Sequence, residues 1–90
     1  MQVVQTNRFE KSYKKLQKNQ LADVNKAIQE IMTNPEIGVQ KKGDLADIRV
    51  HKFKMVGQLT LIAYIYESDK IILTLVAIGS HENFYRDIKR

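Results

Sequence analysis

Two long apolar runs in the second half of the chain constrain its fold most strongly. Residues 59–66 read LTLIAYIY and residues 71–78 read IILTLVAI, and this enrichment in β-branched and aromatic side chains is typical of strands. Only four residues, 67–70, separate the runs, so we expect antiparallel neighbours. Because both runs are apolar on both faces, they are predicted to be interior strands, covered by helices on one face and partly covered on the other.

An amphipathic segment near the N-terminus predicts a first helix. Phe9, Tyr13 and Leu16 recur at i, i+4 and i+7, which is the spacing of one helix face. Asn7 and Glu10 have the spacing of a capping box, so the helix is expected to begin there. Residues 1–6, which precede it, are expected to form a short strand.

A second helix is predicted between a break at residues 19–20 and Pro35, which disfavours further helix. Its apolar stripe consists of Leu21, Val24, Ala27, Ile28 and Ile31. The short link between the two segments predicts an antiparallel helical hairpin. Residues 36–44, with two glycines and a Lys-Lys pair, are expected to be a loop.

The elements together predict a single α+β domain over residues 1–90, with the order β-α-α-β-β-β and a short C-terminal helical turn from near Ser80. The first strand of the predicted meander spans residues 48–54 and has mixed polarity. Alternation places Arg49 and His51 on one of its faces and Val50 on the other. If the apolar face is the core face, Ile48 and Val50 contact the helices and the two basic side chains project from the helix-free face.

Composition limits the classes of function. Fifteen Lys and Arg residues against ten Asp and Glu residues give a net charge of +5, which favours a polyanionic partner such as nucleic acid, or an acidic protein. The absence of cysteine excludes disulfides and thiolate catalysis, and two histidines without cysteine give little basis for a zinc site. No metal and no cofactor are expected. No segment has the length and apolarity of a membrane span, so a cytoplasmic protein without membrane association is predicted.

The residues after the last apolar run carry groups suited to RNA cleavage. His81, Tyr85 and Arg86 follow a glycine turn. Cleavage without metal needs a base for the ribose 2′-hydroxyl, an acid for the leaving oxygen and cations for the phosphorane. Histidine suits the acid or base role, and an aromatic ring such as that of Tyr85 stacks on a base or holds a phosphate.

Four basic side chains are candidate phosphate ligands, namely Arg49, Lys52, Lys54 and Arg86. His51 is a possible complement to His81, although a lone strand histidine is more often a half-exposed surface residue. Whether the two histidines meet depends on the strand order, which the sequence leaves open.

The whole chain resembles the small toxins of bacterial type II toxin–antitoxin modules in the RelE/ParE superfamily. The resemblance rests on the helical hairpin, on the basic strand IRVHKFK at residues 48–54, and on the ending GSHENFYR at residues 79–86. It implies a toxin neutralised by a partner antitoxin that wraps its surface. In the ribosome-dependent branch, it implies a metal-independent endoribonuclease that enters the ribosomal decoding site and cleaves mRNA.

The resemblance also implies roles for individual residues. A catalytic residue just after the glycine-ended strand corresponds to His81, and the aromatic four residues later corresponds to Tyr85. Basic side chains on the first meander strand correspond to Arg49 and His51. Many of these ribonucleases carry arginine or histidine near the start of the next strand, where this chain reads QLTL from residue 58, so that phosphate-stabilising role is absent or moved to Lys52 or Lys54.

Two other readings remain open at the level of sequence. The ParE branch shares the fold but poisons DNA gyrase, and a non-catalytic domain that only binds its antitoxin or nucleic acid would share the same basic surface. Fold alone does not choose among these functions.

Overall fold

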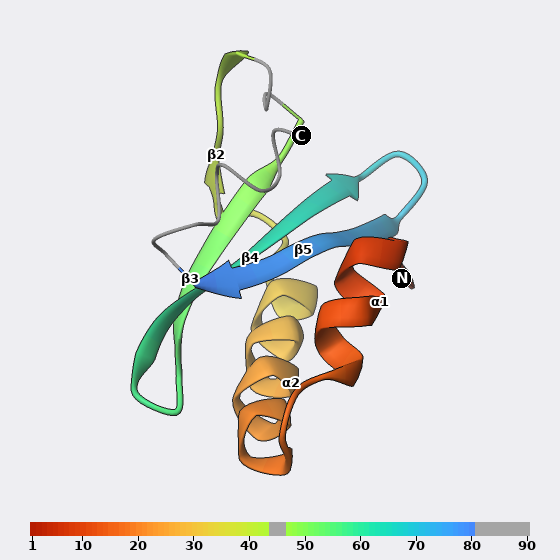
Figure 1. The fold of residues 1–90 in the computed structure, drawn as a ribbon. Coiled ribbons are helices and arrows are strands. Elements are labelled where there is room, and N and C mark those ends of the chain that lie inside the picture. Colours follow the sequence, from red (N-terminus) through yellow and green to blue (C-terminus); the bar gives the residue numbers. More distant parts are fainter. Residues whose placement is uncertain (44–46, 81–90) are drawn as a thin grey trace.

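The computed structural model describes residues 1–43 and 47–80. It is an α+β fold in which both helices lie on the same side of one five-stranded sheet (Figure 1). The predicted element order is confirmed, with one additional strand. The elements are β1 (Gln2–Gln5), α1 (Asn7–Lys14), α2 (Lys18–Thr33), β2 (Val39–Gln40), β3 (Arg49–Met55), β4 (Gln58–Glu67) and β5 (Ile72–Ser80). The helical turn predicted after Ser80 lies outside the described residues.

The strand order is β1-β5-β4-β3-β2. Strands β3 to β5 form the predicted antiparallel meander, β2 pairs antiparallel with β3, and β1 pairs parallel with β5 at the edge of the sheet. Strand β2 is the additional element, because Val39 and Gln40 pair with Val50 and Arg49 in a segment that we expected to be only a loop. Within the described residues, no helix is long and apolar enough to cross a membrane.

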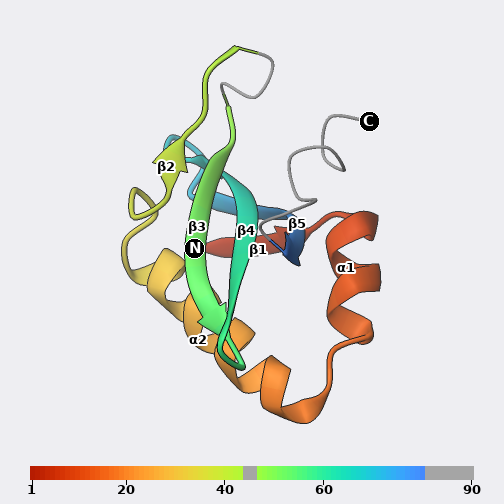
Figure 2. The same ribbon diagram turned by 60° about the vertical axis from the view of Figure 1, so that its left-hand side comes forward.

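The helix boundaries differ from the predicted ones. Thr6, and not Asn7, is the N-cap of α1, and its Oγ1 accepts the backbone N–H of Phe9 at 3.1 Å. The expected capping box is therefore wrong, and Glu10 instead pairs with Lys14 at 2.9 Å. The break between the helices falls at residues 15–17, earlier than predicted. The two helices run in roughly opposite directions and splay apart (Figure 2).

The main core lies between the helices and the sheet. Its fully or almost fully buried residues come from α1, α2, β4 and β5, and they are Phe9, Val24, Ala27, Ile31, Ile62, Tyr64, Leu73 and Leu75. The stripes predicted for both helices supply half of this cluster. Burial of such side chains contributes about 1.5–3 kcal/mol each for the large ones, so the helical layer is held mainly by this contact.

A second, smaller apolar cluster occupies the opposite face of the sheet and consists of Val50, Leu61, Ala63 and Ala77. This cluster overturns the predicted orientation of β3. Val50 packs on the helix-free face, and Phe53 packs against the main core on the helix face. The prediction failed because β3 is apolar on both faces, and the alternation of side chains does not reveal which face carries the helices.

A β-bulge interrupts the pairing of β4 with β5. Tyr64 pairs with Leu75 and the preceding Ala63 pairs with Ala77, so Val76 is an extra residue on β5. Bulges of this kind shift the register by one residue and redirect the strand that follows.

The β3–β4 hairpin closes with two residues, Val56 and Gly57, between the paired Met55 and Gln58. Their φ angles are 49° and 81°, the combination of positive values found in type I′ turns. The N–H of Val56 donates to Asp23 Oδ2 of α2 at 2.8 Å, so the hairpin tip is attached to the helical layer.

Candidate nucleic-acid interface

Lys52 and Lys54 define the exposed basic surface of the helix-free face. They alternate along β3 with helix-facing residues, so both side chains project from the same face, about 7 Å apart at the backbone. Lys52 pairs across the sheet with Leu61, which pairs in turn with Gly79, so these three residues form one row over β3, β4 and β5. Neither ammonium group has an ion-pair partner among residues 1–43 and 47–80.

His51 lies on the opposite, helix-covered face. Its Nε2 is 3.4 Å from Glu30 Oε1 of α2, and its ring stacks on Phe53 with centroids 6.2 Å apart. Its side chain is only 11% exposed. The expectation that His51 projects from the helix-free face is therefore wrong, because α2 packs over this part of β3.

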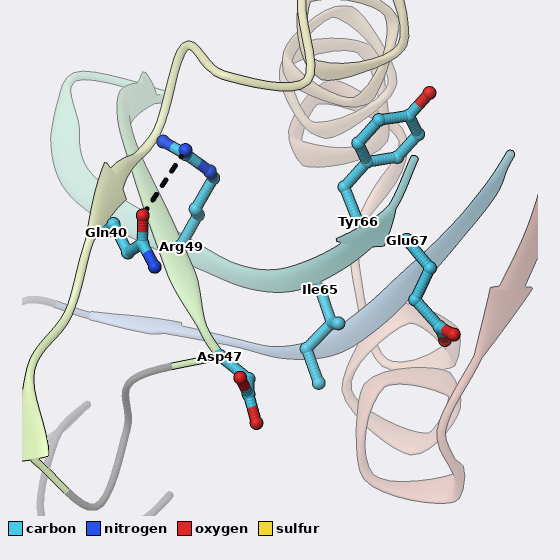
Figure 3. A pocket seen from close by; sticks show the side chains of 6 residues that line it. All are labelled: Gln40, Asp47, Arg49, Ile65, Tyr66 and Glu67. Atoms are coloured by element: carbon cyan, nitrogen blue, oxygen red, sulfur yellow. Dashed lines mark hydrogen bonds between the residues drawn. The ribbon is translucent and has the colours of Figure 1, made fainter. Parts of the chain in front are cut away.

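Arg49 is also on the helix side, and its guanidinium is occupied by the protein itself. Nη1 donates to the carbonyl oxygens of Gly38 at 3.0 Å and Glu36 at 3.4 Å, and Nη2 donates to Gln40 Oε1 at 3.4 Å (Figure 3). Glu36 and Gly38 lie in the segment that connects α2 to β2, and Gln40 lies in β2 itself. Arg49 therefore holds this segment against β3, and the prediction that Arg49 projects from the helix-free face is wrong.

Tyr64, in the main core, also holds the segment between α2 and β2, and together with Gly38 it forms what we call the buried anchor. Its hydroxyl donates to the carbonyl of Pro35 at 2.6 Å and accepts the N–H of Gly38 at 2.9 Å. A Cβ added at Gly38 would lie 2.7 Å from the Tyr64 hydroxyl oxygen, so only glycine fits there. Burial raises the pKa of Tyr64, while the hydrogen bond from Gly38 and the charge of Arg49 oppose part of that rise.

An open hollow of about 540 Å³ lies where β3 and β4 separate beyond the Arg49–Tyr64 pair (Figure 3). Its lining consists of Gln40, Asp47, Arg49, Ile65, Tyr66 and Glu67. A second hollow of about 320 Å³ lies between α2 and the outer edge of β3, and it contains Lys26, Lys52 and Lys54 together with Asp23 and Glu30. Both hollows mix the two signs of charge, so neither is a purely cationic groove.

The predicted site residues thus divide into three groups. Lys52 and Lys54 share the helix-free face, and Arg49 and His51 share the helix face. His81, Tyr85 and Arg86 lie outside the described residues. In the described part of the chain, no three His, Cys, Asp or Glu side chains gather as a metal site would require.

Sequence reasoning missed the anchor formed by Tyr64 and Gly38. The sequence placed Tyr64 in an interior strand and Gly38 in a loop. The residues are 26 positions apart, and no local pattern joins a strand tyrosine to a distant glycine.

A splayed helical hairpin on one face of a mixed five-stranded sheet, with lysines on the other face, defines a RelE-like fold. The structure is similar to Escherichia coli RelE in the intact RelBE toxin–antitoxin complex, with a TM-score of 0.71 and 20% identity over 90% of this chain and 96% of that one. It is also similar to isolated E. coli RelE, with a TM-score of 0.69 and 20% identity over 99% of this chain and 96% of that chain.

RelE bound to a peptide of the antitoxin RelB gives a TM-score of 0.70, again at 20% identity, over 99% of this chain and 95% of that one. No curated protein matches the sequence. The family described as ParE-like toxins of type II bacterial toxin–antitoxin systems matches residues 3–89. The chain belongs to this family, and the resemblance to the RelE/ParE superfamily inferred from sequence is confirmed.

Proposed function

We propose that this toxin is a ribosome-dependent, metal-independent endoribonuclease that cleaves mRNA and so inhibits translation. The observation that carries the proposal is the pair of exposed ammonium groups of Lys52 and Lys54 on the helix-free face, neither of which has an ion-pair partner in the part of the chain that the structure describes. Cations held at neighbouring positions on a rigid strand suit the successive phosphates of a nucleic-acid strand and the charge that develops at the scissile one.

The proposal assigns the proton transfers to the end of β5. Gly79 lies in the same row as Lys52, and the chain reaches His81 two residues later. His81 acts as acid or base, Tyr85 orients the nucleotide, and Arg86, like Lys52 and Lys54, binds phosphate. Arg49 and His51 leave the proposed catalytic set, because their side chains are engaged with Gly38 and Glu30 on the helix face.

We further propose that a cognate antitoxin covers the basic face and silences the toxin in the cytoplasm. The net charge of +5 favours an acidic partner. The crystallisation of the structurally similar RelE with RelB supports the same kind of pairing here.

Toeprinting of translating ribosomes tests the catalytic proposal. The wild-type protein should cut the message at the codon in the ribosomal A site, and His81→Ala should lower the rate by about 10²–10⁴ because a proton-transfer group is lost. An undiminished cut with a folded His81→Ala variant would exclude His81 from catalysis.

The lysine pair is tested by binding to ribosomes at several salt concentrations. Lys52→Ala with Lys54→Ala should weaken binding and lower the slope of log K against log salt by up to about 1.4, which corresponds to two single-strand phosphate contacts. The matched control is Lys11→Ala with Lys15→Ala, which removes the same charge from exposed positions on α1 and just after it. Equal losses in the two double variants would mean that only net charge matters.

The alternative is poisoning of DNA gyrase, and the match to a ParE-like family favours it. A gyrase supercoiling assay separates the two functions. Enzyme-linked DNA breaks without any cut message would replace the ribonuclease proposal, and an absence of both effects would favour a non-catalytic, antitoxin-binding domain.

A further inference from the structure

The bulge at Val76 decides which face of the sheet the end of β5 presents. Beyond the bulge, Ala77 pairs with Ala63, Ile78 with Ile62 and Gly79 with Leu61. Without the extra residue, continuation of the Tyr64–Leu75 register would place Ile78 opposite Leu61. A one-residue slip moves every following side chain to the other face of a sheet.

The packing agrees with the bulged register. Ile78 packs against the main core on the helix side, whereas Ala77 joins the small cluster on the helix-free side. In the slipped register, Ile78 would stand in the row of Lys52 on the helix-free face, and Gly79 would turn toward the helices. Because of the bulge, the β5 residue in the row of Lys52 on the helix-free face is Gly79 and not Ile78.

Thr6 bonds directly to the bulged segment. Its backbone N–H donates to the carbonyl of Leu75 at 3.0 Å, and its hydroxyl donates to the carbonyl of Val76 at 2.6 Å. The same Oγ1 accepts the N–H of Phe9 as the N-cap of α1. One hydroxyl thus joins the start of the helical layer to the residue at which the register of β5 changes.

We infer that Thr6 is a positioning residue for the proposed ribonuclease site. Its hydroxyl stabilises the Val76 bulge and so sets the register in which β5 places Gly79 beside Lys52 on the helix-free face. The inference rests on the proposed function for its catalytic consequence only. A bulged residue leaves backbone groups outside the ladder, and a hydroxyl that satisfies one of them favours the bulged register over the regular one. Sequence reasoning treated Thr6 only as the end of the first strand.

Three variants separate the two bonds of the hydroxyl. Thr6→Val keeps the shape and removes both bonds. Thr6→Asp keeps a good helix cap but cannot donate to the Val76 carbonyl when ionised, so it removes the contact with the bulge alone. Thr6→Ser keeps both bonds. The matched control is Thr33→Val, which removes an exposed hydroxyl that donates to Gln29 on α2 at 2.9 Å.

The first measurement is made on the free protein by NMR. Thr6→Asp and Thr6→Val should exchange the amide protons of residues 77–80 about tenfold faster or more, and weaken the cross-strand contact between Leu61 and Gly79. Thr6→Ser and Thr33→Val should match the wild type. Wild-type protection and register in a folded Thr6→Asp variant would overturn the inference.

The second measurement is message cleavage on the ribosome. Thr6→Asp should lower the single-turnover rate about tenfold with little change in ribosome affinity, because Lys52 and Lys54 are untouched, and Thr6→Ser should restore the rate. If the wild type cuts no message while the exchange pattern behaves as described, the ribonuclease proposal fails and the structural role of Thr6 stands. If the wild type cuts and Thr6→Asp cuts equally well, Thr6 has no positioning role.

Discussion

Removal of the Tyr64 hydroxyl should destabilise this fold far more than the loss of one oxygen suggests. In Tyr64→Phe, the N–H of Gly38 loses its acceptor at 2.9 Å and the carbonyl of Pro35 loses its donor at 2.6 Å. Tyr64 has no exposed surface and Gly38 is buried, so water does not readily replace the hydroxyl at Gly38. Arg49 still holds the carbonyl of Gly38, which hinders the segment from moving to find another partner.

The magnitude follows from the two orphaned groups. A buried donor left without an acceptor costs about 1–3 kcal/mol, and loss of a hydrogen bond to a half-buried carbonyl adds about 1 kcal/mol. The free energy of unfolding should therefore fall by about 3 kcal/mol. In a domain of this size such a loss lowers Tm by roughly 10–20 °C.

Urea denaturation followed by circular dichroism measures the effect, with Tyr13→Phe as the matched control. The Tyr13 hydroxyl donates to Asn25 Oδ1 at 2.6 Å, but this pair is exposed, so water replaces the bond and the loss should stay below about 1 kcal/mol. Equal losses in the two variants would refute the argument that the buried anchor holds the segment between α2 and β2.

Two further predictions concern pH and the hairpin turn. Burial raises the pKa of Tyr64 above the ordinary value of about 10, so the folded state holds the phenolic proton more tightly than the unfolded state, and stability should fall as pH rises above about 10. Urea midpoints measured from pH 8 to 11 should decline less steeply in Tyr64→Phe than in the wild type. Parallel declines in the two proteins would contradict this prediction. Val56→Asn should raise the free energy of unfolding by about 1 kcal/mol, because a β-branched residue at a φ of 49° is strained and asparagine tolerates that region. An unchanged urea midpoint would show that Val56 is not strained in the turn.

The sequence predicted the elements that depend on local pattern. The apolar runs gave β4 and β5, and the periodic stripes gave both helices, because strands and helices must each bury an apolar face with their own period. The two residues of β2 escaped prediction, because a strand that short has no period of its own and exists only through its pairing with Val50 and Arg49.

The candidate site was less predictable, because its geometry depends on which face of β3 the helices cover. The alternation correctly placed Val50 on the opposite face of β3 from Arg49 and His51. It did not reveal that α2 covers the face with His51, since Val50 and Phe53 make both faces apolar. The bulge at Val76 was equally hidden, because it appears only when β4 and β5 are aligned residue by residue.

The position of β5 between β1 and β4 has a consequence for the synthesis of this protein. Until β5 has been synthesised, β1 has no partner and α1 cannot bury Phe9 against Leu73 and Leu75. Pairing between segments some 70 residues apart carries a large loop-closure cost and makes folding slow compared with that of local helical folds. A nascent chain that stops before β5 therefore lacks both contacts, and the fold is completed late, after the ribosome has translated nearly all of residues 1–80.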